Sequence, residues 1–195
     1  MNNTSATGNY YNIKAVTLIT GLTDRTIRNY ISLGILEGEK INGLWHFTPA
    51  QVESFIRHPA VGKECALALN EKGADVVFQI ASKCGDGVFE AAKEKGFYAI
   101  GVDSDQKYID PEVIICSMCK EVGDSIYDAV KQYMEKGDDC GLWGTTWVAD
   151  MATGYVGIGY GEEGATQQVS DEIKLEVEGL AKMIVDGEIE VETTR

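Results

Sequence analysis

The sequence predicts an α/β protein built from two modules, a small α+β head of the winged helix-turn-helix type and a larger lobe with a parallel sheet. Short helical patterns flank an Asn-Gly turn near the N-terminus, and strand and helix patterns alternate after residue 60. Residues 1–60 carry five Lys and Arg against four Asp and Glu, whereas the remaining 135 residues carry 12 against 27. We therefore expect a flexible leader at 1–10, the head at 11–59 and the lobe at 60–195.

The composition is typical of a folded protein, with 44% apolar and 25% charged residues in a chain of 195. No apolar run approaches the ~18–20 residues that a membrane span needs. The first residues lack the basic start and apolar stretch of a secretion signal. Five cysteines, an odd number, suit a reducing compartment. These observations predict a cytoplasmic protein without a membrane partner.

Two short helices separated by a tight turn are predicted at the start of the head. The first helix follows the N-cap Asn12, stops at Gly21 and carries a run of apolar residues, namely Ile13, Val16, Leu18 and Ile19. The second follows the N-cap Thr23, ends at Gly34 and buries Ile27, either Tyr30 or Ile31, and Leu33. This arrangement is typical of a helix-turn-helix, whose second helix presents its first residues to the major groove of DNA.

A hairpin and a third helix are predicted to complete the head. Asn42-Gly43 can supply the two positive φ angles of a type I′ turn, so a β-wing is expected around it. Thr48-Pro49 supplies an N-cap followed by proline at the first helical position. The third helix is expected to turn Val52, Phe55 and Ile56 inward.

The head contains the pattern TxRxYxxxGIL, which begins at Thr26, and the wing sequence NGLWHFTPAQV. On these motifs, residues 11–57 resemble the MerR-type DNA-binding head and its excisionase-like relatives. Such regulators usually carry an arginine where this wing has Trp45, and they usually continue into a long dimerising helix. The resemblance implies DNA contacts from Arg25, Thr26, Arg28, Asn29, Lys40, Trp45 and His46. Arg28 is alternatively an ordinary solvated helix position, and Trp45 is alternatively a core residue between wing and helices.

Alternating strands and helices are predicted for the lobe. Helices are expected at 62–73 and 86–96, and strands at 74–81, 97–103, 112–117 and 152–160. The helix after Lys120 is expected to bury Val122, Ile126, Ala129, Val130 and Tyr133. The last helix is expected to bury Ile173, Val177, Leu180, Ala181 and Ile184. Strand-helix-strand units imply a parallel sheet, whose ligands bind at the carboxyl ends of the strands, here at 81–87, 103–106 and 117–120.

The lobe contains the stretch 73–106, which includes IGVDSDQ, followed by Ser117-x-x-Lys120. On these motifs, residues 62–195 resemble the C-terminal lobe of the basic membrane protein family, which binds purine nucleosides for import. It implies that an acidic residue at a strand end holds the sugar hydroxyls, that a glycine-rich loop passes beneath the nucleoside and that a lysine contacts the ligand. The implied ligand residues are Ser82, Lys83, Gly85, Asp103, Asp105 and Lys120.

The resemblance agrees with the chemistry of these groups, because one carboxylate can accept two hydrogen bonds from vicinal hydroxyls. Asp103 is alternatively a solvated or helix-capping carboxylate, and Lys120 is alternatively a cation that merely pairs with it. Family members close two lobes on the ligand, whereas this chain carries the winged head in place of the first lobe. A single lobe offers half of a pocket.

Catalytic and metal chemistry find little support in the sequence. Cys116-x-x-Cys119 has the spacing of half a zinc site or of a redox pair. Cys116 lies in an apolar strand pattern, however, which favours a small buried residue. His46 and His58 do not form a hydrolytic triad with any plausible nucleophile, and no phosphate-binding GxxxxGK[ST] loop occurs. We expect neither an enzyme nor a bound metal or cofactor.

These patterns together predict a DNA-binding transcription regulator whose lobe serves for dimerisation and as a candidate ligand sensor. The expected partners are double-stranded DNA, a purine nucleoside or related small molecule, and a second copy that pairs through the lobe. The alternative is a protein that binds a purine nucleoside and whose winged head mediates protein contacts. The low positive charge of the head motivates this alternative.

Overall fold

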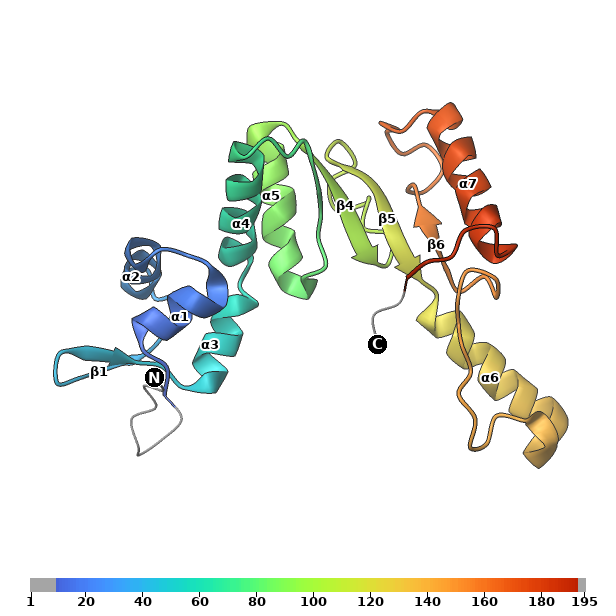
Figure 1. The fold of residues 1–195 in the computed structure, drawn as a ribbon, viewed down its shortest axis with the longest axis horizontal. Coiled ribbons are helices and arrows are strands. Elements are labelled where there is room, and N and C mark those ends of the chain that lie inside the picture. The colour runs from blue at the N-terminus through green and yellow to red at the C-terminus, as the bar shows by residue number, and fades with distance from the viewer. Residues whose placement is uncertain (1–9, 193–195) are drawn as a thin grey trace. The chain divides into compact units, whose positions relative to one another are not determined.

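The computed structural model describes residues 10–192 of the chain (Figure 1). The leader predicted at 1–10 therefore lies almost wholly outside the described residues. The chain forms two compact units. The first contains the residues up to Lys72 together with Ala81–Ala91, and the second contains Gly73–Ile80 together with the residues from Ala92 onward. The domain boundary expected after residue 59 stays a prediction.

The first unit is mainly helical. Its elements are α1 (Ile13–Thr20), α2 (Asp24–Ser32), β1 (Glu39–Ile41), β2 (Leu44–His46), α3 (Pro49–Ile56), α4 (Pro59–Glu71), the 3-10 helix η1 (Ser82–Cys84) and the first turns of α5 (Gly85–Lys95). The expected order of two helices, a hairpin and a third helix is thus present, and α4 follows directly.

The three short helices α1, α2 and α3 begin at the side-chain caps that the sequence predicts. The Asn12 side chain accepts a hydrogen bond from the backbone N–H of Ala15, and the Thr23 side chain accepts one from Thr26. At α3, Thr48 and Gln51 form a reciprocal capping box. These bonds satisfy N–H groups that otherwise have no partner within a helix.

The turn between β1 and β2 has the expected backbone geometry. Asn42 has a φ of 49° and Gly43 a φ of 81°, and the two antiparallel strands pair with Ile41 opposite Leu44. Both central residues of a type I′ turn need positive φ, which glycine adopts without strain and asparagine tolerates. The Asn-Gly signal therefore identified the hairpin correctly.

The core of the first unit lies between its three short helices and the end of β2. Several apolar side chains there are at most 1% exposed, namely Val16, Ile27, Leu36, Phe47 and Phe55. The expectation that Leu33 is buried was wrong, because this side chain is 61% exposed at the end of α2. Leu18 and Ile19 of α1 are also exposed. Helices of two turns offer only a narrow face to the core, and these three residues lie outside it.

The second unit contains one four-stranded sheet in the order β3-β4-β5-β6. The strands are β3 (Val76–Phe78), β4 (Tyr98–Asp103), β5 (Ile114–Lys120) and β6 (Val156–Gly159). β3, β4 and β5 run parallel, whereas β6 pairs antiparallel with β5. The prediction of a parallel sheet is therefore confirmed for β3, β4 and β5 and wrong for β6. Parallel sheets with one antiparallel edge strand are common among α/β folds.

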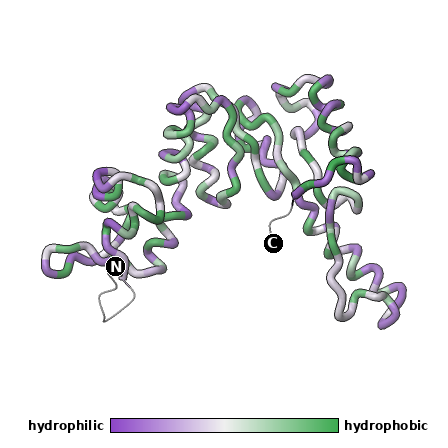
Figure 2. Tube along the Cα trace, viewed as in Figure 1, coloured by the Kyte–Doolittle hydropathy of each residue, from purple (hydrophilic) through white to green (hydrophobic). Residues whose placement is uncertain are grey.

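One face of this sheet is buried, and the other is exposed at β3 and at the start of β4. Val77, Ala99 and Ile114 share the buried face, while Val76, Phe78 and Tyr98 alternate with them and are 39–44% exposed. Hydrophobic residues nonetheless follow β4 and β5 along the chain (Figure 2). This continuity explains why the strands were recognisable in the sequence.

Besides the last turn of α5, the second unit contains three further elements: α6 (Val122–Lys136), the 3-10 helix η2 (Gly137–Cys140) and α7 (Asp171–Val185). The expectation that α6 buries its apolar face was wrong, because Val122, Ile126 and Val130 are all more than half exposed. The apolar face of α7 is only partly covered, since Ile173 is 51% and Leu180 46% exposed. Within the described part of the chain, no helix has both the length and the apolar character that a bilayer span requires.

Candidate ligand-binding site

Asp103 ends β4 in an unusual backbone conformation. Its φ is 71°, and the N–H of Ser104 donates to the carbonyl oxygen of Val102 at 2.9 Å, so the three residues form a γ-turn with positive φ. A non-glycine residue in this region costs roughly 1–2 kcal/mol, and such residues gather at ligand sites. The turn ends the strand abruptly and leaves the Asp103 carboxylate in solvent.

Lys120 lies at the carboxyl end of the neighbouring strand and pairs with Asp103. Its Nζ atom donates to Oδ1 of Asp103 at 2.9 Å, and the two side chains are 50% and 65% exposed, respectively. An ion pair with this exposure contributes about 0–1 kcal/mol to stability. Both groups can therefore exchange their mutual contact for a ligand at little cost.

A buried network behind this pair holds the strand ends in place, and the sequence reasoning missed it. Oε1 of Gln106 accepts hydrogen bonds from Nε2 of Gln79 at 2.7 Å and from the N–H of Val102 at 2.9 Å. The N–H of Gln106 donates to Oγ of Ser117 at 3.0 Å. One glutamine thus ties the ends of β3, β4 and β5 together. Gln106 is the last residue of the DSDQ stretch. The sequence marks this stretch as a motif but does not reveal the hydrogen bonds that Gln106 makes.

Asp105 supports the loop after β4 with both of its carboxylate oxygens. Oδ2 accepts from the N–H of Gly161 at 2.7 Å, and Oδ1 accepts from the N–H of Lys107 at 3.0 Å. The side chain of Lys107 is fully buried, and its Nζ atom donates to the carbonyl oxygen of Ile114 at 2.7 Å. Burial lowers the pKa of the Lys107 ammonium, while the charge of Asp105 opposes this shift. Asp105 and Lys107 are therefore built into the scaffold of the loop.

An aromatic pair, also missed in the sequence, lies next to the end of β5. The carbonyl oxygen of Tyr155 accepts a hydrogen bond from the N–H of Glu121 at 2.8 Å, directly after Lys120. The ring of Trp147 meets the ring of Tyr155 edge to face, with centroids 5.3 Å apart. The side chain of Trp147 remains 42% exposed. Aromatic surface is thus available in the same unit as the ion pair.

The three residues predicted in the glycine-rich loop belong to the first unit. Ser82 and Lys83 are exposed in η1, and Gly85 is buried at the start of α5. Ser82 has a φ of 50°. The structure therefore brings together Asp103 and Lys120 with Asp105 nearby in the chain, and it places Ser82, Lys83 and Gly85 in the other unit.

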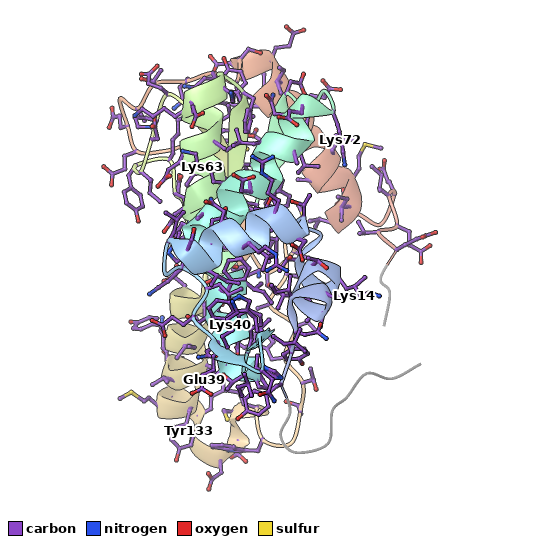
Figure 3. The ribbon with its side chains drawn as sticks, turned by 90° about the vertical axis from the view of Figure 1, so that its left-hand side faces the viewer. Lys14, Glu39, Lys40, Lys63, Lys72 and Tyr133 are labelled. Atoms are coloured by element: carbon purple, nitrogen blue, oxygen red, sulfur yellow. The ribbon has the colours of Figure 1, made fainter. Side chains whose placement is uncertain are left out.

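The residues predicted to contact DNA lie on α2 and on the hairpin. Arg28 is already paired, because its Nε atom donates to Oδ1 of Asp24 at 2.5 Å one turn earlier. Thr26 shares a hydrogen bond of 2.9 Å with the Thr23 hydroxyl. Arg25 and Asn29 are exposed on α2. Lys40 is exposed on β1, and Lys14 extends from the head (Figure 3).

The two ring residues of the wing differ in their contacts, since Trp45 packs on the core whereas His46 meets the backbone of its own hairpin. Trp45 stacks on Phe47 with ring centroids 6.2 Å apart and an interplanar angle of 8°, and it packs against the core of the first unit. Nδ1 of His46 lies 3.1 Å from the carbonyl oxygen of Leu44. The alternative of a core role for Trp45 is therefore the one that its contacts favour.

Cys116 and Cys119 occupy opposite faces of β5. Cys116 lies opposite Ile100 and Cys119 opposite Asp103, and an odd spacing along a strand always separates two side chains in this way. Burial raises the pKa of both thiols. Reactive cysteines have lowered pKa values. The two residues therefore have the character of structural cysteines.

An exposed carboxylate and ammonium at the carboxyl ends of parallel strands define an α/β lobe suited to binding a small molecule. Comparison with known proteins gives the same class. A model of the family described as "ABC transporter substrate-binding protein PnrA-like" matches residues 51–195. The chain therefore belongs to this family, and most of the head precedes the matched region.

Curated relatives support the assignment over part of the chain. Basic membrane protein D of Borreliella burgdorferi (strain JD1) is 42% identical over 79 residues, which is 40% of this chain and 23% of the relative. Basic membrane protein B of Borreliella afzelii (strain PKo) is 33% identical over 105 residues, which is 53% of this chain and 30% of the relative. The chain thus spans less than a third of the length of these relatives.

Solved structures share the fold. An ABC transporter solute-binding protein from Aeropyrum pernix K1 superimposes with a TM-score of 0.56 at 25% identity, over 71% of this chain and 45% of that chain. A transcriptional activator of the comK gene from Bacillus halodurans gives a TM-score of 0.55 at 19% identity, over 73% of this chain and 54% of that one. At this low identity the second likeness shows the fold alone.

These findings correct two expectations and confirm a third. The prediction of a MerR-type, DNA-binding transcription regulator is contradicted, because the matched family consists of transporter substrate-binding proteins. The expected cytoplasmic localisation is contradicted as well, because the relatives are named as basic membrane proteins and as transporter solute-binding proteins. Proteins of this family bind ligands and are not enzymes, as expected for this chain.

Proposed function

We propose that the second unit binds a purine nucleoside through Asp103 and Lys120. The observation that carries the proposal is the exposed carboxylate of Asp103, held on a γ-turn at the end of β4 with Lys120 at 2.9 Å. A carboxylate can accept hydrogen bonds from both hydroxyls of a ribose, and such charge-assisted bonds are stronger than neutral ones. Membership of a substrate-binding family supports a small-molecule ligand.

Other residues have supporting roles in this proposal. Asp105, Gln106 and Lys107 fix the loop that follows Asp103, because all three hold backbone groups of the second unit. Trp147 offers an exposed ring on which a base can stack. The family resemblance also implies ligand contacts from Ser82, Lys83 and Gly85. The binding experiment described next does not depend on these three residues.

The test is calorimetry with inosine, guanosine and adenosine, and with the 2′,3′-dideoxy form of each. We expect the ribonucleosides to bind and the dideoxy forms to bind at least about tenfold more weakly, since the paired hydroxyls are the groups that Asp103 recognises. Asp103→Asn should weaken ribonucleoside binding by a similar factor. Asparagine tolerates the positive φ of this position, so the fold is preserved.

A matched control is available in the first unit. Glu53 forms an exposed ion pair of 2.6 Å with Arg57, and its side chain is 63% exposed. Glu53→Gln therefore removes a comparable carboxylate and should leave binding unchanged. Equal affinity for the ribose and dideoxy forms, or an equal loss in both variants, would show that Asp103 does not hold the sugar.

We also propose that the first unit binds a protein partner. The exposed apolar side chains of the first unit, with Leu18 at 79%, Leu33 at 61% and Leu44 at 68%, favour a head that contacts protein. A photo-cross-linker at position 44 should then form adducts in cells, and one at the exposed polar position 71 should not. For the second unit we propose a second copy of the chain as the partner.

A further inference from the structure

Helix α6 carries a straight row of exposed apolar side chains. Val122, Ile126, Val130 and Met134 follow each other at intervals of four residues and are 57%, 59%, 52% and 80% exposed. Residues with this spacing form one continuous ridge along the surface of a helix. We call these four residues the α6 ridge. Within α6, all of which is described, no residue is buried.

The side-chain hydrogen bonds of α6 with the rest of its own chain come from a different, mostly polar side. Nε2 of Gln132 donates to the carbonyl oxygen of Cys140 at 3.0 Å, and Asp128 accepts from the Tyr155 hydroxyl at 2.7 Å. Ser125, Ala129 and Gln132, spaced i, i+4 and i+7, are the half-buried residues of the helix. An amphipathic helix normally turns its apolar side toward its own core. Here the polar side makes the hydrogen bonds to the rest of the chain, and the four residues of the α6 ridge stay more than half exposed.

Three aromatic rings widen the ridge into a patch. Tyr127 and Tyr133 flank it on the helix, and Trp143 meets Tyr133 edge to face with ring centroids 5.5 Å apart. Figure 3 shows Tyr133 on α6. Contiguous apolar surface of this kind marks an interaction site on a folded protein.

The charge of the chain restricts what can cover this patch. The whole chain has a formal net charge of −14, so two copies repel each other wherever their carboxylates approach. The α6 ridge and its three aromatic neighbours carry no charged group, whereas Asp124 and Asp128 lie on another side of the helix. The ridge is thus a surface on which a second acidic chain can dock without bringing carboxylates together.

The spacing of the ridge also makes it self-complementary. Its four residues are symmetric about position 128, so a two-fold axis beside the helix middle places Val122 opposite Met134 of the second copy and Ile126 opposite Val130. Ridges spaced by four residues interdigitate at a crossing angle of about −50°, the commonest class of helix packing. We propose that the chain forms a homodimer in which the α6 ridges of two copies pack against each other about a two-fold axis.

The area available is adequate for such a dimer. The three aromatic side chains, at about 150–250 Å² each and between 44% and 66% exposed, offer on the order of 300–400 Å² per copy. The ridge adds a comparable area. A stable interface buries about 1,200–2,000 Å² in total, and two copies reach the lower part of this range.

Light scattering coupled to gel filtration tests the proposal. The full chain at micromolar concentrations should give twice the monomer mass of 21.2 kDa. Ile126→Asp should raise the dissociation constant at least about tenfold, because it places two carboxylates within the apolar contact. Ile126→Leu should retain the dimer. Leu175→Asp changes a side chain of α7 that is 69% exposed and should leave the mass unchanged.

Hydrogen exchange on the unchanged chain gives a second readout. Protection of the α6 amides should increase with protein concentration, while that of α7 should not. A monomeric mass for the full chain would overturn the proposal, as would a dimer that survives Ile126→Asp. Hydrogen exchange in α6 that does not depend on protein concentration would also overturn it. This measurement uses the unchanged chain, so it still tests the proposal if a variant fails to fold.

Discussion

Gly62 of helix α4 lies directly against the backbone carbonyl of Cys84. A Cβ atom at position 62 would overlap the Cys84 oxygen, and one at Gly87 would overlap the Pro59 oxygen in the same way. The first unit therefore brings α4 and the start of α5 together through two glycines. Both are buried, and both belong to the first unit. Close approach of backbones at glycine is a recurrent device for packing helices tightly.

Gly62→Ala should destabilise the protein by about 1–3 kcal/mol, because the added methyl group must push one backbone segment away from the other. Urea unfolding measures the change. Gly179 of α7 is the matched control, since nothing lies within 4 Å of a Cβ at that position. Gly179→Ala should stabilise by up to about 1 kcal/mol through helix propensity alone. A loss of similar size in both variants would contradict the proposed steric cause.

Tyr30→Phe should change how stability depends on alkaline pH. Tyr30 is 5% exposed, and its hydroxyl donates to the carbonyl oxygen of Ala60 at 3.0 Å. Burial, above all, raises the pKa of Tyr30 to about 12, from 10.0. As the pH rises, the unfolded chain therefore loses this proton at a lower pH than the folded protein does. The stability that the Tyr30 hydroxyl contributes below pH 10 is lost as the pH rises through about 12.

Near neutral pH, the loss of the hydroxyl should cost about 1 kcal/mol. At about pH 11 the difference between the two proteins should shrink, since the phenylalanine variant has no proton to lose. Urea titrations at both pH values give the comparison. A difference that stays constant, or grows, would show that the ionisation of Tyr30 does not couple to folding.

Lys107→Met should destabilise the protein by about 1–3 kcal/mol, because it leaves buried acceptors without a donor. Nζ of Lys107 donates to the carbonyl oxygen of Ile114 and, at 2.6 Å, to Oε1 of Gln168. The pKa of the lysine is lowered from 10.5, so the folded protein releases this proton before the unfolded chain does. The stability of the parent protein should therefore rise as the pH approaches 10.5, through the deprotonation of Lys107. The Lys107→Met variant should lack this rise.

Lys93 provides the control for this lysine. It pairs with Asp110 at 2.8 Å but has a side chain that is 72% exposed, so Lys93→Met should change stability much less than Lys107→Met does. Chemical unfolding of both variants in parallel distinguishes a buried from a solvated ammonium. Equal losses would indicate that the hydrogen bonds of Lys107 contribute nothing beyond its packing.

The local features of the fold were predictable, because their causes lie within a few residues. The Asn42-Gly43 turn and the caps at Thr23 and Thr48 each follow from side-chain chemistry at a fixed spacing. β4 and β5 were recognisable as apolar runs. The direction of β6 was not, since a strand has the same alternation whether it pairs parallel or antiparallel.

The burial of α6 and the inner parts of the site could not be predicted in the same way. The spacing of Ile126 and Val130 predicts a helix with one apolar face. It does not show whether that face packs against the same chain or against another molecule. Asp103 and Lys120 were found because both follow strand patterns. Gln106 and Lys107 were missed as structural groups because polar residues gain buried roles only through tertiary contacts. The DNA-binding hypothesis was wrong because a short helical motif indicates a local fold and does not identify the molecule that the fold binds.

The placement of Cys116 and Cys119 on opposite faces of β5 has a bearing on oxidative damage. Two sulfur atoms separated by the thickness of a strand cannot join while the strand keeps its pairing. An oxidant would have to break the ladder between β4, β5 and β6 before it could close a ring there. A disulfide between these two cysteines is therefore not expected in the folded sheet, whether its surroundings are oxidising or reducing.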